Sequence, residues 1–158
     1  MAPTTFHFRT ATDGDAFAIS ALIADFTQDF FVHADGAGTE IFLESVSEKA
    51  EQVYIQDPRY HFILALEDEK LAGFIAMRDL SHLYHLFIAT EFQGLGLARE
   101  LWQRAQAFST SSGHTGPFTV NSSVKAIPVY QRFGFVATGD LIEMHGIAFL
   151  PMRFCEDI

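Results

Sequence analysis

The sequence predicts a mixed α/β fold in which one sheet is flanked by helices. Helical and strand-like segments alternate along the chain, and a clear antiparallel hairpin, residues 60–77, lies in the middle. The 158 residues, 49% of them hydrophobic, match the size and core of one ordinary domain. No repeat, linker or low-complexity tract divides the chain, so residues 1–158 are predicted to form a single domain.

The N-terminal quarter is predicted to hold one strand and one helix. Residues 6–9 alternate between apolar and polar side chains, as a half-buried strand does. Asp13 and Asp15 stand where negative charge favours a helix start, and residues 16–25 are rich in Ala, Ile and Leu. Residues 26–38 hold three Phe and several small turn residues, which predicts the end of this helix and then a loop.

A second helix and the hairpin follow. Thr39 is predicted to cap a helix from Glu40 to about Ile55, which an Asp-Pro pair ends. The apolar stripe of this helix is expected to be Ile41, Val46, Ala50 and Val53. Strands at 60–66 and 71–77 are joined by a polar four-residue turn, which predicts the hairpin.

The next strand, His82 to Ala89, continues into a glycine-rich loop. A helix from about Leu97 to Thr110 follows, and a Ser-Ser-Gly run ends it. Its apolar stripe is predicted to be Ala98, Leu101, Ala105 and Phe108. Residues 118–121 are predicted to form the next strand.

The C-terminal quarter is predicted to hold one short helix and the last strands. Ser122 and Ser123 are expected to cap the helix, which ends at Gly134, a left-handed residue. Pro128 lies inside it and is expected to cost a backbone hydrogen bond. Strands are predicted at 135–137 and at 143–154.

Charge and composition exclude several classes of protein. The net charge of −10 gives an acidic surface that repels phosphate backbones, so no nucleic-acid partner is expected and cationic amines are favoured. The single cysteine, Cys155, excludes a disulfide framework and is interpreted as a packing residue. The sequence shows no signal peptide and no apolar run of the ~18 residues that a membrane span needs. A cytoplasmic protein without a membrane partner is therefore expected.

The glycine-rich loop, residues 93–98, is the segment with a chemical signature. Gly94 and Gly96 permit positive φ and a close approach of the backbone to a ligand. The first N–H groups of the following helix lack intrahelical acceptors and carry the positive end of the helix dipole, so an anion such as pyrophosphate fits there. The alternative is that the glycines only make a tight turn between strand and helix.

Two well-known phosphate loops do not fit this segment. A P-loop needs Lys and then Ser or Thr after the second glycine, where this chain has Leu97 and Ala98. A Rossmann fingerprint needs a small residue in place of Arg99 and an acidic residue about 20 residues further on. That downstream region, residues 113–118, has no acidic residue. A nucleotide-binding domain of the P-loop or Rossmann type is therefore disfavoured.

Two motifs in order carry a resemblance to a known family. Gln93, Gly96 and Ala98 match the pattern Gln-x-x-Gly-x-Gly/Ala after a strand, and residues 121–135 contain an Ala-Ile pair, a Tyr and a terminal Gly-Phe. The first segment resembles motif A, and the second motif B, of the GNAT superfamily of acyl-CoA N-acyltransferases. The resemblance covers residues 5–155 and implies a mostly antiparallel sheet that is splayed at the cofactor strand.

The resemblance implies a site for acetyl-CoA as cosubstrate and no metal. The strand residues that would pair with the pantetheine arm are Leu86, Phe87 and Ile88. The loop residues whose amides would hold the pyrophosphate are Gln93, Gly94, Leu95, Gly96, Leu97 and Ala98. Arg99 is expected either to reach a phosphate oxygen or to be solvated. Asn121 is expected either to bond the pantetheine or an ordered water, or to cap the turn that follows.

The resemblance also implies an acid for the leaving thiolate. Tyr130 matches the position at which family members commonly use a tyrosine as general acid, and the alternative is a core aromatic residue. No carboxylate lies between Leu80 and Thr90, so the candidate bases are His82 and His85, with bulk solvent as the alternative. Strand alternation predicts that the two histidines lie on opposite faces, so that at most one faces the cleft.

Two further groups of residues have less specific patterns. His33 and Asp35 are too few ligands to indicate a metal site. Phe26, Phe30 and Phe31 are expected either to line an acceptor pocket or to belong to the core.

The predicted function is the transfer of an acetyl group from acetyl-CoA to an amine by direct attack in a ternary complex. The alternative is a non-catalytic acyl-CoA-binding or regulatory module, and the presence of Tyr130 and Asn121 favours the enzyme. The acceptor amine is expected to belong to a small molecule or a peptide. The resemblance is compatible with a homodimer, in which case the apolar stretch 146–152 is either an interface or an interior strand.

Overall fold

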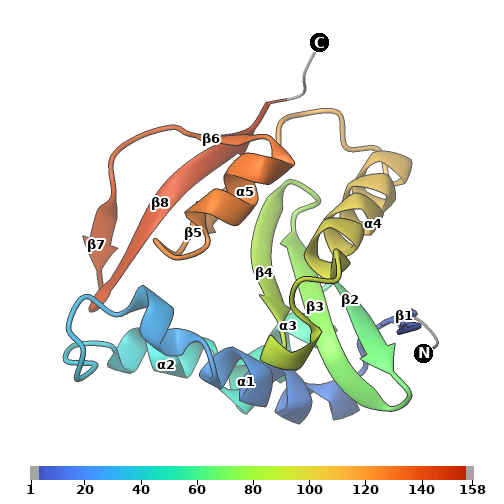
Figure 1. Cartoon of the computed structure of the whole chain (residues 1–158), viewed down its shortest axis with the longest axis horizontal. Coiled ribbons are helices and arrows are strands. Elements are labelled where there is room, and N and C mark those ends of the chain that lie inside the picture. The colour runs from blue at the N-terminus through green and yellow to red at the C-terminus, as the bar shows by residue number, and fades with distance from the viewer. Residues whose placement is uncertain (1–3, 156–158) are drawn as a thin grey trace.

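The computed structural model describes residues 4–155, which form a mixed sheet of eight strands flanked by helices (Figure 1). The strand order is β1-β2-β3-β4-β5-β8-β6, and β7 pairs with β8 beside this path. Neighbouring strands are antiparallel except β4 and β5, which are parallel. The predicted mixed α/β fold with a mostly antiparallel sheet is confirmed.

The bounds of the elements follow the predicted pattern closely. The strands are β1 His7–Thr10, β2 Tyr60–Glu67, β3 Lys70–Arg78, β4 His82–Ile88, β5 Thr119–Ser122, β6 Phe135–Ala137, β7 Ile142–Met144 and β8 Ile147–Phe154. The α-helices are α1 Ala16–Ala24, α2 Glu40–Ser45, α3 Glu48–Gln56, α4 Leu97–Ser111 and α5 Ile127–Phe133. Three short 3-10 helices are η1 Asp13–Asp15, η2 Thr27–Phe30 and η3 Thr90–Phe92.

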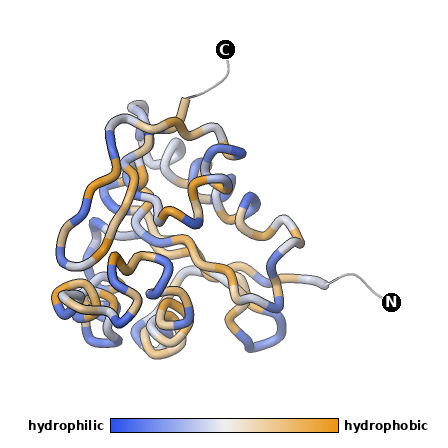
Figure 2. The backbone as a smooth tube through the Cα atoms, turned by 60° about the vertical axis from the view of Figure 1, so that its left-hand side comes forward, coloured by the Kyte–Doolittle hydropathy of each residue, from blue (hydrophilic) through white to orange (hydrophobic). Residues whose placement is uncertain are grey.

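Helices cover both faces of the central strands. On one face α1, α2 and α3 enclose a core of Ile19, Leu22, Ile23, Val46, Phe62, Leu64 and Phe74. On the other face α4 and α5 enclose a second core that includes Ile75, Leu83, Leu101, Trp102, Tyr130, Phe135 and Met152. The hydrophobic stretches of the backbone accordingly run through the central strands, whereas hydrophilic ones gather in the outer turns (Figure 2). Residues 72–77 of β3 are buried throughout, as expected for a strand covered on both faces.

The predicted helix 40–55 is wrong in one respect, because the structure divides it into α2 and α3. Ser47 has an extended backbone, and its hydroxyl accepts a hydrogen bond from the Ala50 N–H at 3.2 Å, so a new helix starts there. Thr39 does not cap α2 with its side chain, since its hydroxyl donates to the Gly36 carbonyl at 2.7 Å. The predicted apolar stripe is also wrong, because Ile41 and Val53 are exposed.

Three smaller predictions also need correction. The hairpin turn has two residues, because Glu67 and Lys70 are already paired. Pro128 lies in the first turn of α5, where a backbone N–H has no intrahelical acceptor, so the proline costs no helical hydrogen bond. The segment 143–154 is divided into β7 and β8 by a turn at residues 145–146. The left-handed Gly134 is confirmed, with a φ of 107°.

The turn between β7 and β8 packs against the loop that precedes α2 (Figure 1). The Val32 N–H donates to the Gly146 carbonyl at 2.9 Å, and Phe31 forms a bridge with Ile147. Gly146 has a φ of 74°, and a Cβ on it would lie 2.8 Å from the Ala37 carbonyl oxygen. Only glycine fits this contact, which joins the N-terminal and C-terminal parts of the chain.

The described helices include none that is both long and apolar enough to span a bilayer.

Gly146→Ala is expected to lower the free energy of unfolding by about 2–3 kcal/mol, since overpacking and a left-handed alanine both destabilise. Gly113→Ala is the matched control, because Gly113 has a φ of 101° but open space around it. The control is expected to cost only ~1 kcal/mol, from the backbone alone. Denaturant unfolding measures both values, and equal losses would show that the Gly146 contact contributes nothing.

Candidate active site

The site is created where β4 and β5 separate. Among the described residues the two strands pair only at His82 with Thr119 and at Leu83 with Val120. Beyond these pairs the rest of β4 has no strand on this side, so its backbone groups face a cleft of about 760 Å³. The predicted splay at the cofactor strand is therefore present, and Leu86, Phe87 and Ile88 line the cleft.

The glycine-rich loop forms one end of this cleft. Gly94 and Gly96 have φ of 81° and 79°, and a Cβ on either would meet nothing within 4 Å. Glycine is therefore required by the backbone conformation, while the space beside it stays open. The Gln93 side-chain amide donates to the Ile88 carbonyl at 3.0 Å, which fixes the loop to the end of β4.

Backbone N–H groups accumulate at this loop. From Gly94 to Arg99, six successive N–H groups have no hydrogen-bond acceptor within residues 4–155, and the Glu100 N–H is the first to bond, to the Gly96 carbonyl at 3.1 Å. Five of these six residues line the cleft, Leu95 being the exception. The free donors and the N-terminal end of the α4 dipole make an anion site. The geometry therefore fits the diphosphate of coenzyme A.

The cleft differs in charge from the protein as a whole. Its lining includes four basic residues, Arg78, Arg99, Lys125 and Arg132, and one carboxylate, Asp29, although the net charge of the chain is −10. Lys125 lies 3.8 Å from Asp29, so this pair joins the η2 wall to the wall before α5. Local basic charge at the cleft favours a phosphate-bearing ligand.

Arg99 is held at the cleft rather than free in solvent. Its guanidinium donates to the Arg132 carbonyl at 3.2 Å and stacks over the Phe133 ring at 5.3 Å. This arrangement keeps a positive charge beside the free N–H groups of the loop. It agrees with the phosphate interpretation better than with a purely solvated side chain.

Asn121 is exposed near the end of β5 and lines the cleft. The turn after it is capped by Ser123, whose hydroxyl accepts from the Ala126 N–H at 3.2 Å. The Asn121 amide makes no hydrogen bond to any other described residue. The amide is therefore available to a ligand, and capping of the following turn falls to Ser123.

Tyr130 projects from α5 into the core and reaches the cleft. The residue is 6% exposed, and its ring packs edge-on against Phe133 and Phe135. Its hydroxyl makes no hydrogen bond within the part of the chain that the structure describes. Burial raises the pKa of this phenol above its ordinary value, so the group carries its proton at neutral pH.

The predicted placement of the two histidines on opposite faces is wrong. Ala76 pairs with His85 and Met77 with Leu83, which leaves Tyr84 as an extra residue in β4. Leu83 and Leu86, three positions apart, consequently both face the α4 core. His82 and His85 then share the opposite face, and both line the cleft.

His82 is a neutral group with one nitrogen in use. Its Nδ1 lies 2.8 Å from the Thr119 hydroxyl. Burial lowers the pKa of His82 to about 4, with a further lowering by Arg78 and a smaller opposing effect of Asp79. The imidazole is therefore uncharged at pH 7, but it binds a proton weakly.

His85 contacts a carboxylate that sequence reasoning missed. Glu51 on α3 is fully buried, and the His85 Nε2 lies 3.1 Å from its Oε1 and 3.2 Å from its Oε2. A glutamate in a helix is ordinarily solvated, so its type gives no signal. The position of Glu51 in the helix does give a signal, because Tyr54 and Ile55, three and four positions later, also pack toward the sheet.

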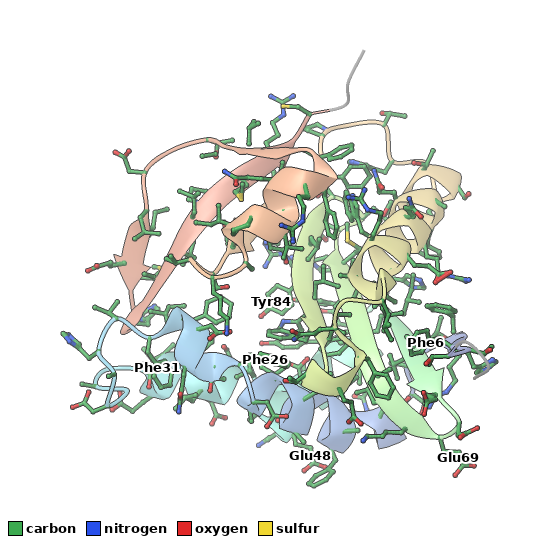
Figure 3. The ribbon with its side chains drawn as sticks, in the orientation of Figure 1. Phe6, Phe26, Phe31, Glu48, Glu69 and Tyr84 are labelled. Carbon is green, nitrogen blue, oxygen red and sulfur yellow. The ribbon has the colours of Figure 1, made fainter. Side chains whose placement is uncertain are left out.

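The part of the cleft away from the loop is aromatic. Six rings line it, from Phe26, Phe30, Phe42, Tyr84, Phe87 and Phe149. Phe26 and Phe30 were predicted to line an acceptor pocket or the core, and they line the cleft. Phe31 does not, because its ring packs over Gly36, and Figure 3 shows it farther from β4 than Phe26 and Tyr84.

The remaining candidate residues lie outside the cleft. His33 and Asp35 are exposed, and the Asp35 carboxylate accepts the Ala37 N–H of its own loop at 3.0 Å. Within residues 4–155 no group of three or more His, Cys, Asp or Glu side chains gathers as a metal site would require. Cys155 is exposed, so its interpretation as a packing residue is wrong.

Comparison with known proteins agrees with this geometry. The family model described as an acetyltransferase (GNAT) domain matches residues 25–155. The streptothricin acetyltransferase of Streptomyces lavendulae is 28% identical over 160 residues, which cover 86% of this chain and 84% of that protein.

Solved structures share the fold. The PaiA N-acetyltransferase of Thermoplasma acidophilum, in complex with coenzyme A, has a TM-score of 0.73 at 14% identity, with 95% of this chain and 98% of that chain covered. The spermidine N-acetyltransferase of Vibrio cholerae, in complex with CoA and spermine, has a TM-score of 0.66 at 22% identity, with 96% of each chain covered. The family match spans most of the chain, and so this protein belongs to the GNAT family as an acetyl-CoA-dependent N-acetyltransferase.

Proposed function

We propose that this enzyme acetylates a primary amine of a small, cationic molecule, which attacks acetyl-CoA directly in a ternary complex. The observation that carries the proposal is the row of free N–H groups from Gly94 to Arg99 at the mouth of the cleft. Family membership favours an enzyme over a binding module without turnover.

The chain's own residues would hold acetyl-CoA in three places. The N–H groups of residues 94–99 would bind the diphosphate, with Arg99 beside them. The unpaired edge of β4, residues 86–88, would pair with the pantetheine arm. Asn121 would bond that arm from the opposite side of the cleft. When bound, acetyl-CoA supplies the acetyl group as a thioester, and the protein supplies orientation.

Tyr130 is proposed as the general acid, and His82 and His85 are the candidate bases. The phenol is protonated at neutral pH and makes no other hydrogen bond to the described residues, so it is free to donate. The raised pKa of Tyr130 does not prevent proton transfer to the leaving thiolate. Burial in the same cleft also makes that thiolate bind a proton more strongly.

The aromatic end of the cleft supports a cationic acceptor. Rings such as Phe26 and Phe42 line this end, and the face of an aromatic ring attracts an ammonium group. The relatives named for streptothricin and spermidine act on small molecules that carry amines, which favours this class over a peptide.

Three further expectations remain proposals. Residues 1–158 are proposed to act as a single N-acetyltransferase domain, because β1 near the N-terminus and β8 near the C-terminus belong to the same sheet. A cytoplasmic location and a homodimer are retained as predictions from the sequence.

The function is tested by ligand binding and by turnover of the purified protein. Acetyl-CoA at a hundredfold excess over its Kd is expected to stabilise the fold by about 2.7 kcal/mol, seen as a higher Tm. Thiol release is then followed with streptothricin, spermidine and a lysine peptide as acceptors. Faster release with the two small molecules supports the proposal. No Tm shift, or release with the peptide alone, contradicts it.

Gly96→Glu is expected to weaken acetyl-CoA binding roughly 10- to 100-fold, about 1.4–2.7 kcal/mol, because it places a carboxylate beside the diphosphate. Gly113→Glu is the matched control, since Gly113 also has positive φ and open space but lies outside the cleft. Titration calorimetry measures both affinities. Normal binding by Gly96→Glu would place the diphosphate elsewhere.

Tyr130→Phe is expected to lower kcat about 100-fold or more, the size of a lost general acid. The Kd of acetyl-CoA should stay within twofold, because the hydroxyl makes no hydrogen bond among the described residues. Steady-state kinetics and calorimetry separate the two quantities. An unchanged kcat would mean that Tyr130 is only a core aromatic residue.

A further inference from the structure

We infer that Glu51 is a positioning residue for acetyl transfer, which holds the His85 imidazole so that its free nitrogen takes a proton from the acceptor amine. The inference rests on the proposed function and selects one of its two candidate bases. It follows from the placement of a buried carboxylate directly behind a histidine that lines the cleft.

Glu51 is costly to bury unless it serves the site. The side chain is fully buried, and no Lys or Arg lies within ion-pair distance of it in the described chain. The His85 Nε2 bonds to Oε2, while Oε1 is as near but has no hydrogen bond of acceptable geometry. A buried carboxylate with a single partner is less stable there than an apolar residue of similar volume would be. Stability alone therefore does not account for it.

The pair fixes which nitrogen of His85 is free. An ionised carboxylate only accepts hydrogen bonds, so Nε2 carries the hydrogen of this bond. In the neutral ring Nδ1 then keeps its lone pair. Since His85 lines the cleft, the inference assigns Nδ1 as the nitrogen that meets a ligand.

Aromatic rings exclude water from the pair. The His85 ring lies 4.4 Å from Tyr84, 5.8 Å from Phe87 and 5.9 Å from Phe74, centre to centre. The titratable groups against the His85 ring are Glu51 and Tyr54 from α3 and Tyr84 from β4. Tyr60 from β2 and Arg78 from β3 pack in turn against Tyr84, and His82 lines the same cleft.

His85 suits the role of base better than His82 does. Burial and Arg78 make His82 a weak proton acceptor, and its Nδ1 is near the Thr119 hydroxyl. His85 has a carboxylate that stabilises the imidazolium once it forms. An alkylammonium must lose a proton before it can attack, so a base with a carboxylate behind it suits this acceptor.

The proton balance is complete with these groups. His85 Nδ1 takes one proton from the ammonium and later releases it to solvent. The amine lone pair forms the new C–N bond at the thioester carbonyl as the C–S bond breaks, with its electron pair going to sulfur. The sulfur takes a proton from Tyr130, and the nitrogen's surplus proton returns to the phenolate.

The extra residue Tyr84 makes this arrangement possible. If Leu83, Tyr84 and His85 alternated regularly, position 85 would face the α4 core, as Leu83 does. The irregularity instead turns His85 toward α3, where Glu51 lies.

Glu51→Gln tests the inference, because it removes the charge and keeps the shape. The variant is expected to lower kcat 10- to 100-fold at pH 7, with the Kd of acetyl-CoA unchanged. Loss of the negative charge disfavours the imidazolium, so the acid limb of kcat against pH should move to lower pH. A merely structural role would not move this limb.

Three variants complete the test. Glu48→Gln makes the same change on the exposed side of α3 and should leave both kcat and the limb unchanged (Figure 3). His85→Gln should lower kcat at least as much as Glu51→Gln does. The double variant of Glu51 and His85 should lower kcat no further than His85→Gln alone, because the two residues act as a unit. Glu51→Asp, which keeps the charge, should keep the limb in place, and it replaces Glu51→Gln if that variant fails to fold.

The outcomes separate this inference from the proposed function. If the wild type is active and the acid limb of Glu51→Gln stays where it is in the wild type, the inference alone is overturned. The same holds if the limb moves as far in Glu51→Asp as in Glu51→Gln. A wild type that binds acetyl-CoA but releases no thiol with any acceptor overturns the proposed function, and this inference with it.

Discussion

The separation of β4 from β5 is the constraint on which the rest of the site depends. Two pairs of residues hold the parallel strands together, and beyond them the sheet has an internal edge. Unpaired backbone groups inside a protein are unfavourable unless something bonds them. Here the edge, the loop after it and the start of α4 all present such groups to one cleft. A ligand with amides and phosphates along its length satisfies that requirement, as coenzyme A does.

The cleft has two environments. The end next to α4 has the free N–H groups of residues 94–99 and the Arg99 guanidinium, whereas the other end is mainly aromatic. In that aromatic end Arg78 lies over the Tyr84 ring, and Asp29 is 3.8 Å from Lys125. The net acidity of the chain therefore does not describe the lining of the cleft.

The sequence predicts best what depends on local pattern. Periodicity located the strands and helices, and the glycine spacing located the loop, because both are properties of consecutive residues. The break between α2 and α3 was missed because apolar residues continue across it, and only the capping by Ser47 reveals it. The faces of His82 and His85 were wrong because an extra residue in a strand leaves no mark on composition. Glu51 was missed because its burial depends on the strands beneath α3.

The hydrogen bond from Val32 to Gly146 lies between elements that carry aromatic rings of the cleft. It joins the loop before α2 to the last hairpin, and the elements around this contact, η2, α2 and β8, supply Phe30, Phe42 and Phe149 to the cleft. A change at the tight glycine contact would therefore shift these rings and alter which acceptor fits, while the N–H groups before α4 belong to another part of the chain.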